Sequence, residues 1–299
     1  MAKSKSKRKD KQKAKPKKQA EKSKSKAGNS RKSLAEQADR FKCYQLSVQS
    51  PEHEIEFFEQ AYREAYRRKP YSLREDFCGT FSICCHWVHS HSKRTALGVD
   101  LCAETLQWGR DHNLASLTKS EQARVRLIEQ DVRKLNRPRV DVLAAQNFSF
   151  WIFKTRAEVI DYFKAARRNL NDQGIMVMDM MGGGDCFIEG HVDKRVIKKG
   201  KKGFSYHWKQ IAFNPVTHDA QFSISFKFKD GSKLKNAFEY NWRFWSVPEV
   251  REMLAEAGFA ESHVYFELED EDGEDTGEWA RKTDTDSNPC WLAYIVAIK

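Results

Sequence analysis

The stretch Leu73-Arg-Glu-Asp-Phe-Cys-Gly79-Thr-Phe-Ser82 predicts a strand that ends in a tight turn, after which a helix begins. Gly79 has no side chain, so a ligand can approach the backbone of this turn closely. In a doubly wound sheet such a turn lies at the carboxyl edge of the first strand, where ligands bind. The neighbouring carboxylates of Glu75 and Asp76 suit a cationic group such as an ammonium. Alternatively, either carboxylate caps the helix that follows.

Short apolar runs and helical patterns alternate around this stretch. The apolar runs lie at 71–77, 96–100, 125–129, 140–146 and 175–180. The helical patterns between them lie at 82–91, 103–114 and 156–170. Thr155 and Glu158 form a capping box at the start of the last one. Nearly continuous apolar strands that alternate with helices predict an α/β fold, in which a parallel sheet is covered on both faces.

The pattern changes beyond this region. Residues 203–245 lack a helical period and alternate in polarity, and Asn214-Pro215 and Asp230-Gly231 are typical of turns between strands. The chain is therefore expected to carry an antiparallel β insertion at about 182–246. A helix at 247–257, a strand near 262–268, an acidic loop at about 269–288 and a final strand at 291–298 complete the expected order.

Helical patterns also precede the first strand. They lie at 34–47 and 51–67, and the second begins with Ser50 as N-cap and Pro51 at its first position. These helices predict an N-terminal cap over residues 34–70, followed by the main domain over residues 71–299.

The first 33 residues differ in composition from the rest of the chain. They carry 15 of the 53 Lys and Arg residues but only 2 of the 42 acidic residues, so the remainder holds 38 basic and 40 acidic residues. They also contain no aromatic residue. Such a segment cannot bury enough apolar surface to fold, so residues 1–33 are expected to be a disordered tail. Its positive charge makes RNA or ribosomes its expected partners, unless it only keeps the chain soluble.

The cysteines and the apolar runs limit where the protein works. The seven cysteines show no CxxC spacing, so reduced thiols and a cytoplasmic location are expected, and no metal site is expected. The N-terminus lacks the apolar core of a secretory signal. No apolar run approaches the roughly 20 residues that span a bilayer, so no membrane partner is expected.

Polar residues end three further predicted strands. Asp100 ends the second strand, where a carboxylate can accept both hydroxyls of a ribose. Asp131 ends the third, where it can accept a hydrogen bond from the exocyclic amine of adenine. Asn147 and Phe148 follow the fourth strand. Because these ends share one edge of the sheet, they predict a nucleoside-binding rim. Alternatively, Asp100 caps the helix that begins at Cys102, Asp131 lies in a surface turn, and residues 147–150 only complete a buried strand.

From Leu73 to Lys299 the chain resembles the class I S-adenosylmethionine-dependent methyltransferases. Their first motif reads acidic-x-Gly-x-Gly-x-Gly, of which this chain keeps the central Gly79, whereas Phe77 and Phe81 replace the other two glycines. The string LREDFCGT, with GVDL, NFSFWIFKTR and FNPVTH downstream, is similar to a widespread bacterial group of methyltransferases. The resemblance implies a Rossmann-like, seven-stranded, mostly parallel sheet with an antiparallel terminal strand.

The resemblance also implies S-adenosyl-L-methionine as the cofactor. Asp100 would then hold the ribose, Asp131 would lie beside adenine, and Gly79 would pass beneath the methionine portion. The expected cofactor-binding residues are Glu75, Asp76, Cys78, Gly79, Asp100, Leu101, Asp131, Val132, Asn147 and Phe148.

The expected reaction is transfer of a methyl group by in-line displacement, which is accelerated mainly by holding the acceptor against the methyl group in a dry site. Aromatic faces also favour the sulfonium cation, and Trp151 and Tyr240 are the predicted walls of the acceptor pocket. The β insertion resembles the lid of small-molecule methyltransferases, so a small-molecule acceptor is expected. No residue identifies a catalytic base. His207 and His218 are candidates, although solvent-facing strand positions explain them equally well.

Three other functions compete with this interpretation. An NAD-dependent dehydrogenase would show Gly-x-Gly-x-x-Gly after the first strand, where this chain has one glycine. An RNA-directed methyltransferase would use the basic tail to hold its substrate. A non-catalytic protein of the same fold would bind the cofactor without an acceptor.

Overall fold

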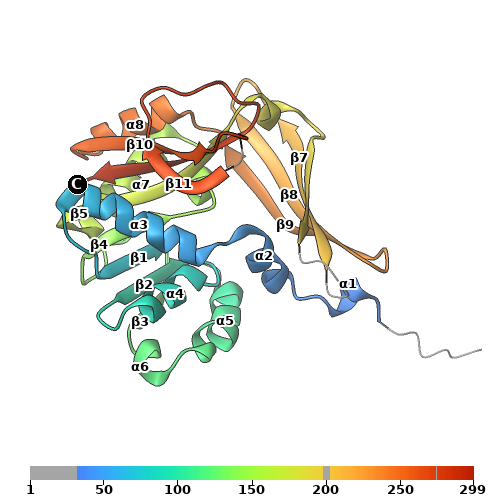
Figure 1. Ribbon diagram of the computed structural model, residues 1–299, viewed down its shortest axis with the longest axis horizontal. Coiled ribbons are helices and arrows are strands. Elements are labelled where there is room, and N and C mark those ends of the chain that lie inside the picture. Colours follow the sequence, from blue (N-terminus) through green and yellow to red (C-terminus); the bar gives the residue numbers. More distant parts are fainter. Residues whose placement is uncertain (1–31, 198–202, 274) are drawn as a thin grey trace, which may run out of the picture. The chain divides into compact units, whose positions relative to one another are not determined.

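A computed structural model describes residues 32–197, 203–273 and 275–299 (Figure 1). The expectations for the lysine-rich tail, namely disorder and binding to RNA or ribosomes, concern residues 1–33, of which residues 1–31 lie outside the described part of the chain. Among the described helices, none combines the length and apolar character needed to cross a membrane.

The central sheet has the order β3-β2-β1-β4-β5-β12-β10-β11. Its first five members in sequence pair in parallel, whereas β12 pairs antiparallel with both β5 and β10. The strands are β1 (Ser72–Asp76), β2 (Thr95–Asp100), β3 (Val125–Glu129), β4 (Val140–Ala145), β5 (Leu170–Gly182), β10 (Glu261–Glu269), β11 (Asp275–Arg281) and β12 (Trp291–Ile298). The predicted α/β fold with a mostly parallel sheet and an antiparallel last strand is confirmed.

The sheet has eight strands where seven were expected. The extra strand, β11, lies inside the region that was predicted to be an acidic loop, and it pairs antiparallel with β10. Its one buried side chain is Trp279, which packs against Phe57 and Tyr294. Because Trp279 is the one buried side chain of β11 and acidic residues surround it, the sequence pattern predicted a loop instead of a strand.

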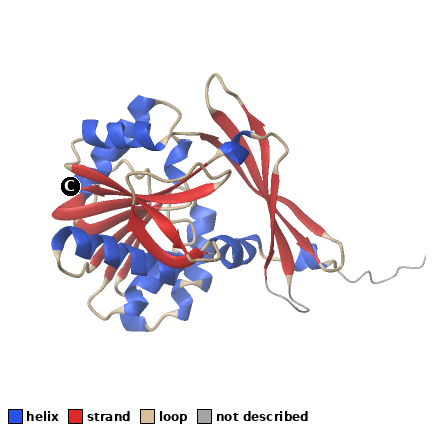
Figure 2. Cartoon of the chain, turned by 45° about the horizontal axis from the view of Figure 1, so that its top comes forward, coloured by secondary structure: helices blue, strands red, loops and turns tan. Residues whose placement is uncertain are grey.

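Helices cover both faces of this sheet (Figure 2). On one face lie α3 (Pro51–Tyr66) and α4 (Ser82–Ser90), and on the other lie α7 (Arg156–Asn169) and α8 (Val247–Glu256). Strand β4 shows why both faces are filled. Val142 and Ala144 enter the core beneath α3 and α4, whereas Leu143 and Ala145 enter the core beneath α7. The helix α5 (Ala103–His112), the short η1 (Leu114–Ser116) and α6 (Lys119–Gln122) connect β2 to β3.

The insertion forms a second, antiparallel sheet in the order β6-β7-β8-β9. Its strands are β6 (Val192–Ile197), β7 (Phe204–Phe213), β8 (Asp219–Phe228) and β9 (Lys233–Arg243). Phe222 and Trp242 join the core beneath α7 and α8, near the turn η2 (Ser149–Ile152), so one end of this sheet is anchored in the main domain. The turn η3 (Gly184–Phe187) connects β5 to the insertion.

The predicted helix at 34–47 is broken into α1 (Leu34–Gln37) and α2 (Arg40–Val48). The break occurs because the side chain of Asp39 accepts hydrogen bonds from the backbone N–H groups of Phe41 and Lys42 and starts a new helix. At the next helix, Ser50 occupies the predicted N-cap position of α3, but its side chain makes no capping hydrogen bond.

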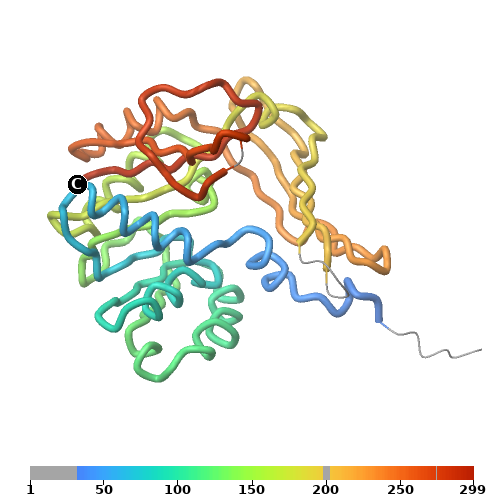
Figure 3. The backbone as a smooth tube through the Cα atoms, in the orientation of Figure 1, coloured from blue at the N-terminus to red at the C-terminus, as the bar shows by residue number. Residues whose placement is uncertain are grey.

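The N-terminal helices connect the insertion with the main domain (Figure 3). At one end the backbone N–H groups of Leu34 and Ala35 donate to Asp230 and Ser232 of the insertion. At the other end the indole of Trp108 on α5 donates to Asp39 over 2.6 Å. The segment thereby brings α2 close to the end of β1.

Candidate functional site

The turn after β1 is held in a left-handed conformation at three positions. Phe77, Gly79 and Phe81 have φ angles of 55°, 53° and 48°. Glycine adopts this conformation freely, whereas each phenylalanine adopts it under strain, so the turn depends on the surrounding structure to hold it. Phe77 and Phe81, which stand where the methyltransferase motif has glycines, thus keep the left-handed backbone conformation.

Asp100 links this turn to the next one. The backbone N–H of Gly79 donates to Asp100 Oδ2 over 2.8 Å, and the backbone N–H of Cys102 donates to Asp100 Oδ1 over 2.8 Å. The carboxylate therefore fixes the start of α5 as well as the turn after β1. Cys102, not Asp100, is the N-cap residue of α5.

A cavity of about 200 Å³ lies beside the turn, and we call it the β1 cavity. Glu75, Asp76, Cys78 and Gly79 line it from the first turn. Gln146 and Asn147 line it from the end of β4, Tyr44 and Gln49 from α2 and the residue after it, and Phe238 and Tyr240 from β9.

The β1 cavity is lined by unpaired oxygen acceptors. Gln146 Nε2 donates to the carbonyl of Val177, which leaves Gln146 Oε1 buried without a partner. Gln49 Oε1 is also buried and unpaired. Glu75 uses Oε2 to accept the backbone N–H of Cys84, and burial raises the pKa of Glu75 to about 8. Because buried acceptors without donors are costly, this group favours a ligand that donates several hydrogen bonds.

Asp76 lines the same cavity, but its carboxylate is already bound. It accepts from Arg74 Nε over 2.6 Å and from the Tyr162 hydroxyl over 3.1 Å, and both carboxylate and guanidinium are almost fully buried. That Asp76 meets a cationic ligand group stays a prediction, and Arg74 of β1 already supplies this carboxylate with a counter-charge. Of the two adjacent carboxylates, Glu75 has no such cation beside it among the described ion pairs.

The residues predicted for the nucleoside lie at neighbouring strand ends but outside this cavity. Asp131 accepts from Arg133 Nη2 over 2.6 Å, and this hydrogen bond lowers the pKa of Asp131. Leu101 is 67% exposed, whereas Val132 is buried. The structure thus brings Glu75, Asp76, Cys78, Gly79 and Asn147 together. It connects Asp100 to them through Gly79, and it leaves Leu101, Asp131 and Val132 apart from the cavity.

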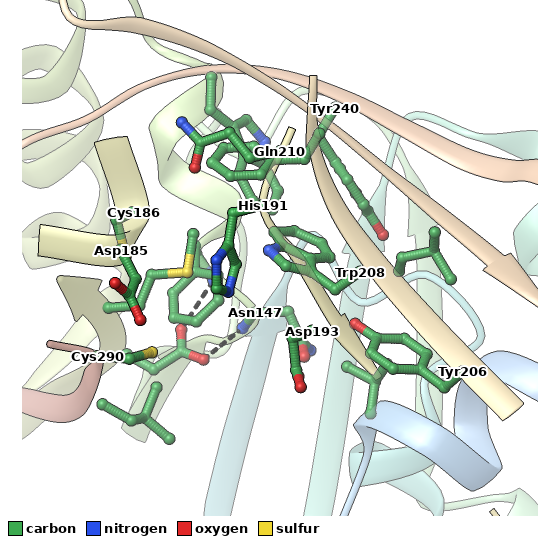
Figure 4. Close-up of a pocket in the computed structure, with 18 of the residues that line it drawn as sticks. Asn147, Asp185, Cys186, His191, Asp193, Tyr206, Trp208, Gln210, Tyr240 and Cys290 are labelled. Carbon is green, nitrogen blue, oxygen red and sulfur yellow. Dashed lines mark hydrogen bonds between the residues drawn. The ribbon is translucent and has the colours of Figure 1, made fainter. Parts of the chain in front are cut away.

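A second cavity, of about 420 Å³, lies between the ends of β4 and β5 and the insertion, and we call it the insertion cavity. Figure 4 shows Tyr206, Trp208 and Tyr240 of the insertion on one side, facing Asp185 and Cys290 on the other. The size is within the range of small-molecule sites.

The two predicted pocket walls differ in position. Tyr240 lines both cavities. Trp151 lines neither, because it is fully buried and packs against Phe148, Trp242 and Phe244. The expectation for Trp151 is corrected: its ring supports the anchored end of the insertion and does not reach the cavity.

Asp179 of β5 is the main residue that the sequence analysis missed. It is buried, lines the insertion cavity, and accepts the backbone N–H groups of Asn147 and Phe148 over 2.8 and 2.9 Å. Asn147 and Phe148 have φ angles of 59° and 55°, so this carboxylate holds a strained turn in place. Burial raises the pKa of Asp179 to about 6. A lone Asp in the apolar run Ile175–Met181 was the signal that marked it.

The two cavities are neighbours. Tyr44, Asn147 and Tyr240 line both of them. A group held in one cavity would therefore lie across this shared wall from a group held in the other.

Neither histidine considered as a base lines a cavity. On β7 the alternate residues Tyr206 and Trp208 line the insertion cavity, so His207 between them lies on the other face of the strand. In the antiparallel pairing of β6 with β7, His207 lies opposite Lys194. His191, which the sequence analysis did not consider, does line the cavity.

No protein-family model matches the chain, and no curated protein matches its sequence. Solved structures do match its fold. An amino pentose methyltransferase from Micromonospora echinaspora, CalS10, shares 16% identity at a TM-score of 0.62, and the match covers 87% of this chain and 96% of that one. The sugar N-methyltransferase KedS8 from Streptoalloteichus shares 17% identity at a TM-score of 0.59, with coverage of 88% and 93%.

A third similar structure is an S-adenosylmethionine-dependent methyltransferase from Clostridium acetobutylicum. It shares 14% identity at a TM-score of 0.62, and the match covers 86% of this chain and 96% of that one. These likenesses show that the chain has the class I methyltransferase fold. The antiparallel β12 between β5 and β10 also separates it from the dinucleotide-binding sheet, in which a sixth parallel strand follows the fifth.

Proposed function

We propose that this chain is an S-adenosylmethionine-dependent methyltransferase of the class I group that carries the LREDFCGT string, and that its acceptor is a small molecule held in the insertion cavity. One observation carries the proposal. At the carboxyl edge of the sheet, a small cavity with unpaired acceptors shares a wall with a larger aromatic one.

The residues of the β1 cavity fit the amino-acid end of S-adenosylmethionine. Its ammonium carries several N–H donors, Gln49 Oε1 and Gln146 Oε1 are buried acceptors without donors, and Glu75 offers a carboxylate beside them. Gly79 leaves the backbone of the turn accessible, since a Cβ there would meet only Thr105, at 3.6 Å. Cys78 and Asn147 complete this part of the site.

Asp100 is proposed to hold the ribose. Leu101, Asp131 and Val132, at the ends of β2 and β3, are proposed for the adenine side. When bound, the cofactor supplies a methyl group activated by a sulfonium. The protein itself positions the acceptor and excludes water. The acceptor would be held at the shared wall of Tyr44, Asn147 and Tyr240, and the aromatic rings keep water from the reacting atoms.

A small-molecule acceptor is favoured by the insertion cavity and by the fold relatives. The cavity volume of about 420 Å³ accommodates a small organic molecule. Two of the relatives are described as an amino pentose methyltransferase and a sugar N-methyltransferase.

Calorimetry with S-adenosylhomocysteine tests the cofactor site directly. The wild type is expected to bind it with a micromolar dissociation constant, and Glu75→Gln is expected to bind it about tenfold more weakly, because the amide loses the charge that pairs with the ammonium. Glu256→Gln on α8, whose side chain is exposed, is the matched control and should bind like the wild type. Lack of any binding to the wild type at millimolar ligand would refute the proposed function.

A further inference from the structure

We propose that the acceptor is a cationic amine, bound as an ammonium by the carboxylates and aromatic rings of the insertion cavity and methylated on nitrogen. This inference rests on the proposed function, since it names the substrate class of the same site.

The charges of the lining residues favour a cation. Three carboxylates, those of Asp179, Asp185 and Asp193, line the insertion cavity. Among the described lining residues, Arg195 is the only Lys or Arg. Arg195 is already engaged, since its Nε lies 3.6 Å from Asp193 Oδ2 and its guanidinium lies 4.6 Å from the centre of the Tyr206 ring.

The remaining two carboxylates lack a positive partner. In the described part of the chain, no ion pair involves Asp179 or Asp185. On α3, burial, with repulsion from Glu75 and Asp179 in the same direction, raises the pKa of the Glu54 carboxyl group well above its usual value, and Glu54 Oε2 makes no hydrogen bond among the described residues. Buried carboxylates that repel one another are stabilised by a bound cation. An anionic acceptor would add to this repulsion.

The rings of the insertion provide the second half of an ammonium site. The Trp208 ring lies 4.8 Å from that of Phe222 and 5.7 Å from that of Tyr240, and the Tyr240 ring lies 4.4 Å from that of Trp242. Of these rings, those of Trp208 and Tyr240 face Asp185 across the cavity (Figure 4). Aromatic faces attract ammonium groups and bind the carbon atoms around them, which neutral polar acceptors do not require.

The cavity also contains a group that can receive the amine proton. An ammonium has no lone pair, so it must first lose a proton, and Asp179 lies at the shared wall beside Asn147. The nitrogen lone pair then forms the N–CH₃ bond while the S–CH₃ bond breaks and its electron pair stays on sulfur. The products are an N-methylammonium and S-adenosylhomocysteine, and Asp179 later returns its proton to solvent.

Three soluble probes of nearly the same shape test the charge preference. Choline is a cation, 3,3-dimethylbutan-1-ol is its neutral counterpart, and 3,3-dimethylbutanoate is an anion. Their dissociation constants are measured by tryptophan fluorescence, with and without saturating S-adenosylhomocysteine. Choline is expected to bind at least tenfold more tightly than the alcohol, and the anion most weakly. Equal binding of choline and the alcohol, or tighter binding of the anion, overturns the inference.

Variants then test whether the preference for choline over the alcohol depends on the insertion cavity. Asp185→Asn and Asp193→Asn alter side chains that are partly or fully exposed, so the fold should be retained. Each is expected to reduce the preference for choline over the alcohol several-fold. Asp161→Asn, on the exposed side of α7, makes the same change in net charge outside the cavity and should leave the preference unchanged.

The two proposals fail separately in this experiment. If S-adenosylhomocysteine does not bind, the proposed function fails, while the choline preference is still measured in its absence. If S-adenosylhomocysteine binds and choline gains nothing over the alcohol, only the amine inference fails.

Discussion

The two cavities share three wall residues, yet they are built in different ways. The β1 cavity is formed largely by the turns that follow β1 and β4, so its shape follows from the sheet itself. The insertion cavity is formed by side chains of β6, β7, β8 and β9 on one side, and by β5, η3 and the start of β12 on the other. The sheet and its turns thus form the side that we propose for the cofactor, whereas the insertion contributes to the side that we propose for the acceptor.

The largest effect is expected at Asp179, which supports both cavities. Asp179→Ala leaves the buried backbone N–H groups of Asn147 and Phe148 without an acceptor, so the free energy of unfolding should fall by about 2–4 kcal/mol. Urea denaturation measures this loss. Asp193→Asn, on the exposed side of the insertion cavity, should change stability by less than about 0.5 kcal/mol. Similar losses in the two variants would mean that Asp179 does not hold the shared wall.

The next largest effect is expected on the binding of S-adenosylhomocysteine alone, which distinguishes its site from the insertion cavity. Asp100→Ala should weaken the binding of S-adenosylhomocysteine by about 1–3 kcal/mol, because it removes both the proposed ribose contact and the acceptor for Gly79. Calorimetry measures this change. The binding of choline should not change.

Asp131→Ala tests the second carboxylate that is proposed to contact the nucleoside. Its carboxylate is paired with Arg133, so its loss should weaken cofactor binding by less than that of Asp100. An equal loss of affinity in the two variants would show that Asp131 breaks its ion pair with Arg133 and itself contacts the ligand.

The third effect is the pH dependence of cofactor binding. Burial holds the pKa of Glu75 at about 8, with repulsion from Asp100 and Asp76 in the same direction and Glu54 also close by. An ammonium favours the carboxylate, so below this pKa Glu75 must release a proton when the ligand binds. The affinity for S-adenosylhomocysteine should therefore rise from pH 6 to about 8, by up to tenfold per pH unit.

Calorimetry in two buffers of different ionisation enthalpy detects the released proton. Above about pH 8 the rise should end, because Glu75 is then already ionised before the ligand binds. Glu75→Gln should remove the slope. A slope that persists in this variant would assign the proton to another group.

The smallest effect is expected at Cys290, which lines only the insertion cavity. A hydrogen bond from the Cys186 thiol lowers the pKa of Cys290 to about 7. Its alkylation by iodoacetamide should therefore quicken about tenfold between pH 6 and 8, as the thiolate forms. Mass spectrometry after peptide digestion follows the reaction, and Cys290→Ser removes it. Choline should slow the labelling more than S-adenosylhomocysteine does; the opposite order would exchange the roles of the two cavities.

The sequence predicted the main sheet well because its strands are continuous apolar runs separated by amphipathic helices. The final strand was predicted at 291–298, where β12 lies. Two local features were missed. Asp39 ends one helix and starts the next, which an apolar period alone does not reveal. Strand β11 depends on Trp279, whose partners Phe57 and Tyr294 are distant in sequence.

The arrangement of the candidate site was predictable only where it follows from the sheet, and its role in binding stays a prediction. Glu75, Gly79 and Asp100 end consecutive strands or turns, and the structure connects them as the strand order requires. The sequence could not show which side chains remain free, because that depends on their partners. Arg74 and Tyr162 bind the carboxylate of Asp76, and the rings around Trp242 pack against the buried Trp151. Gln49 and Tyr44 reach the site from the N-terminal helices, a contact that no local pattern records.

The shared wall links the two binding equilibria thermodynamically. Tyr44, Asn147 and Tyr240 border both cavities, so any ligand that displaces one of them alters the affinity of the other ligand. Reciprocity then requires that each ligand change the other's dissociation constant by the same factor. If the proposed function holds, cooperativity between cofactor and acceptor acts through these three side chains, and α2, which carries Tyr44, gives the N-terminal segment an influence on it.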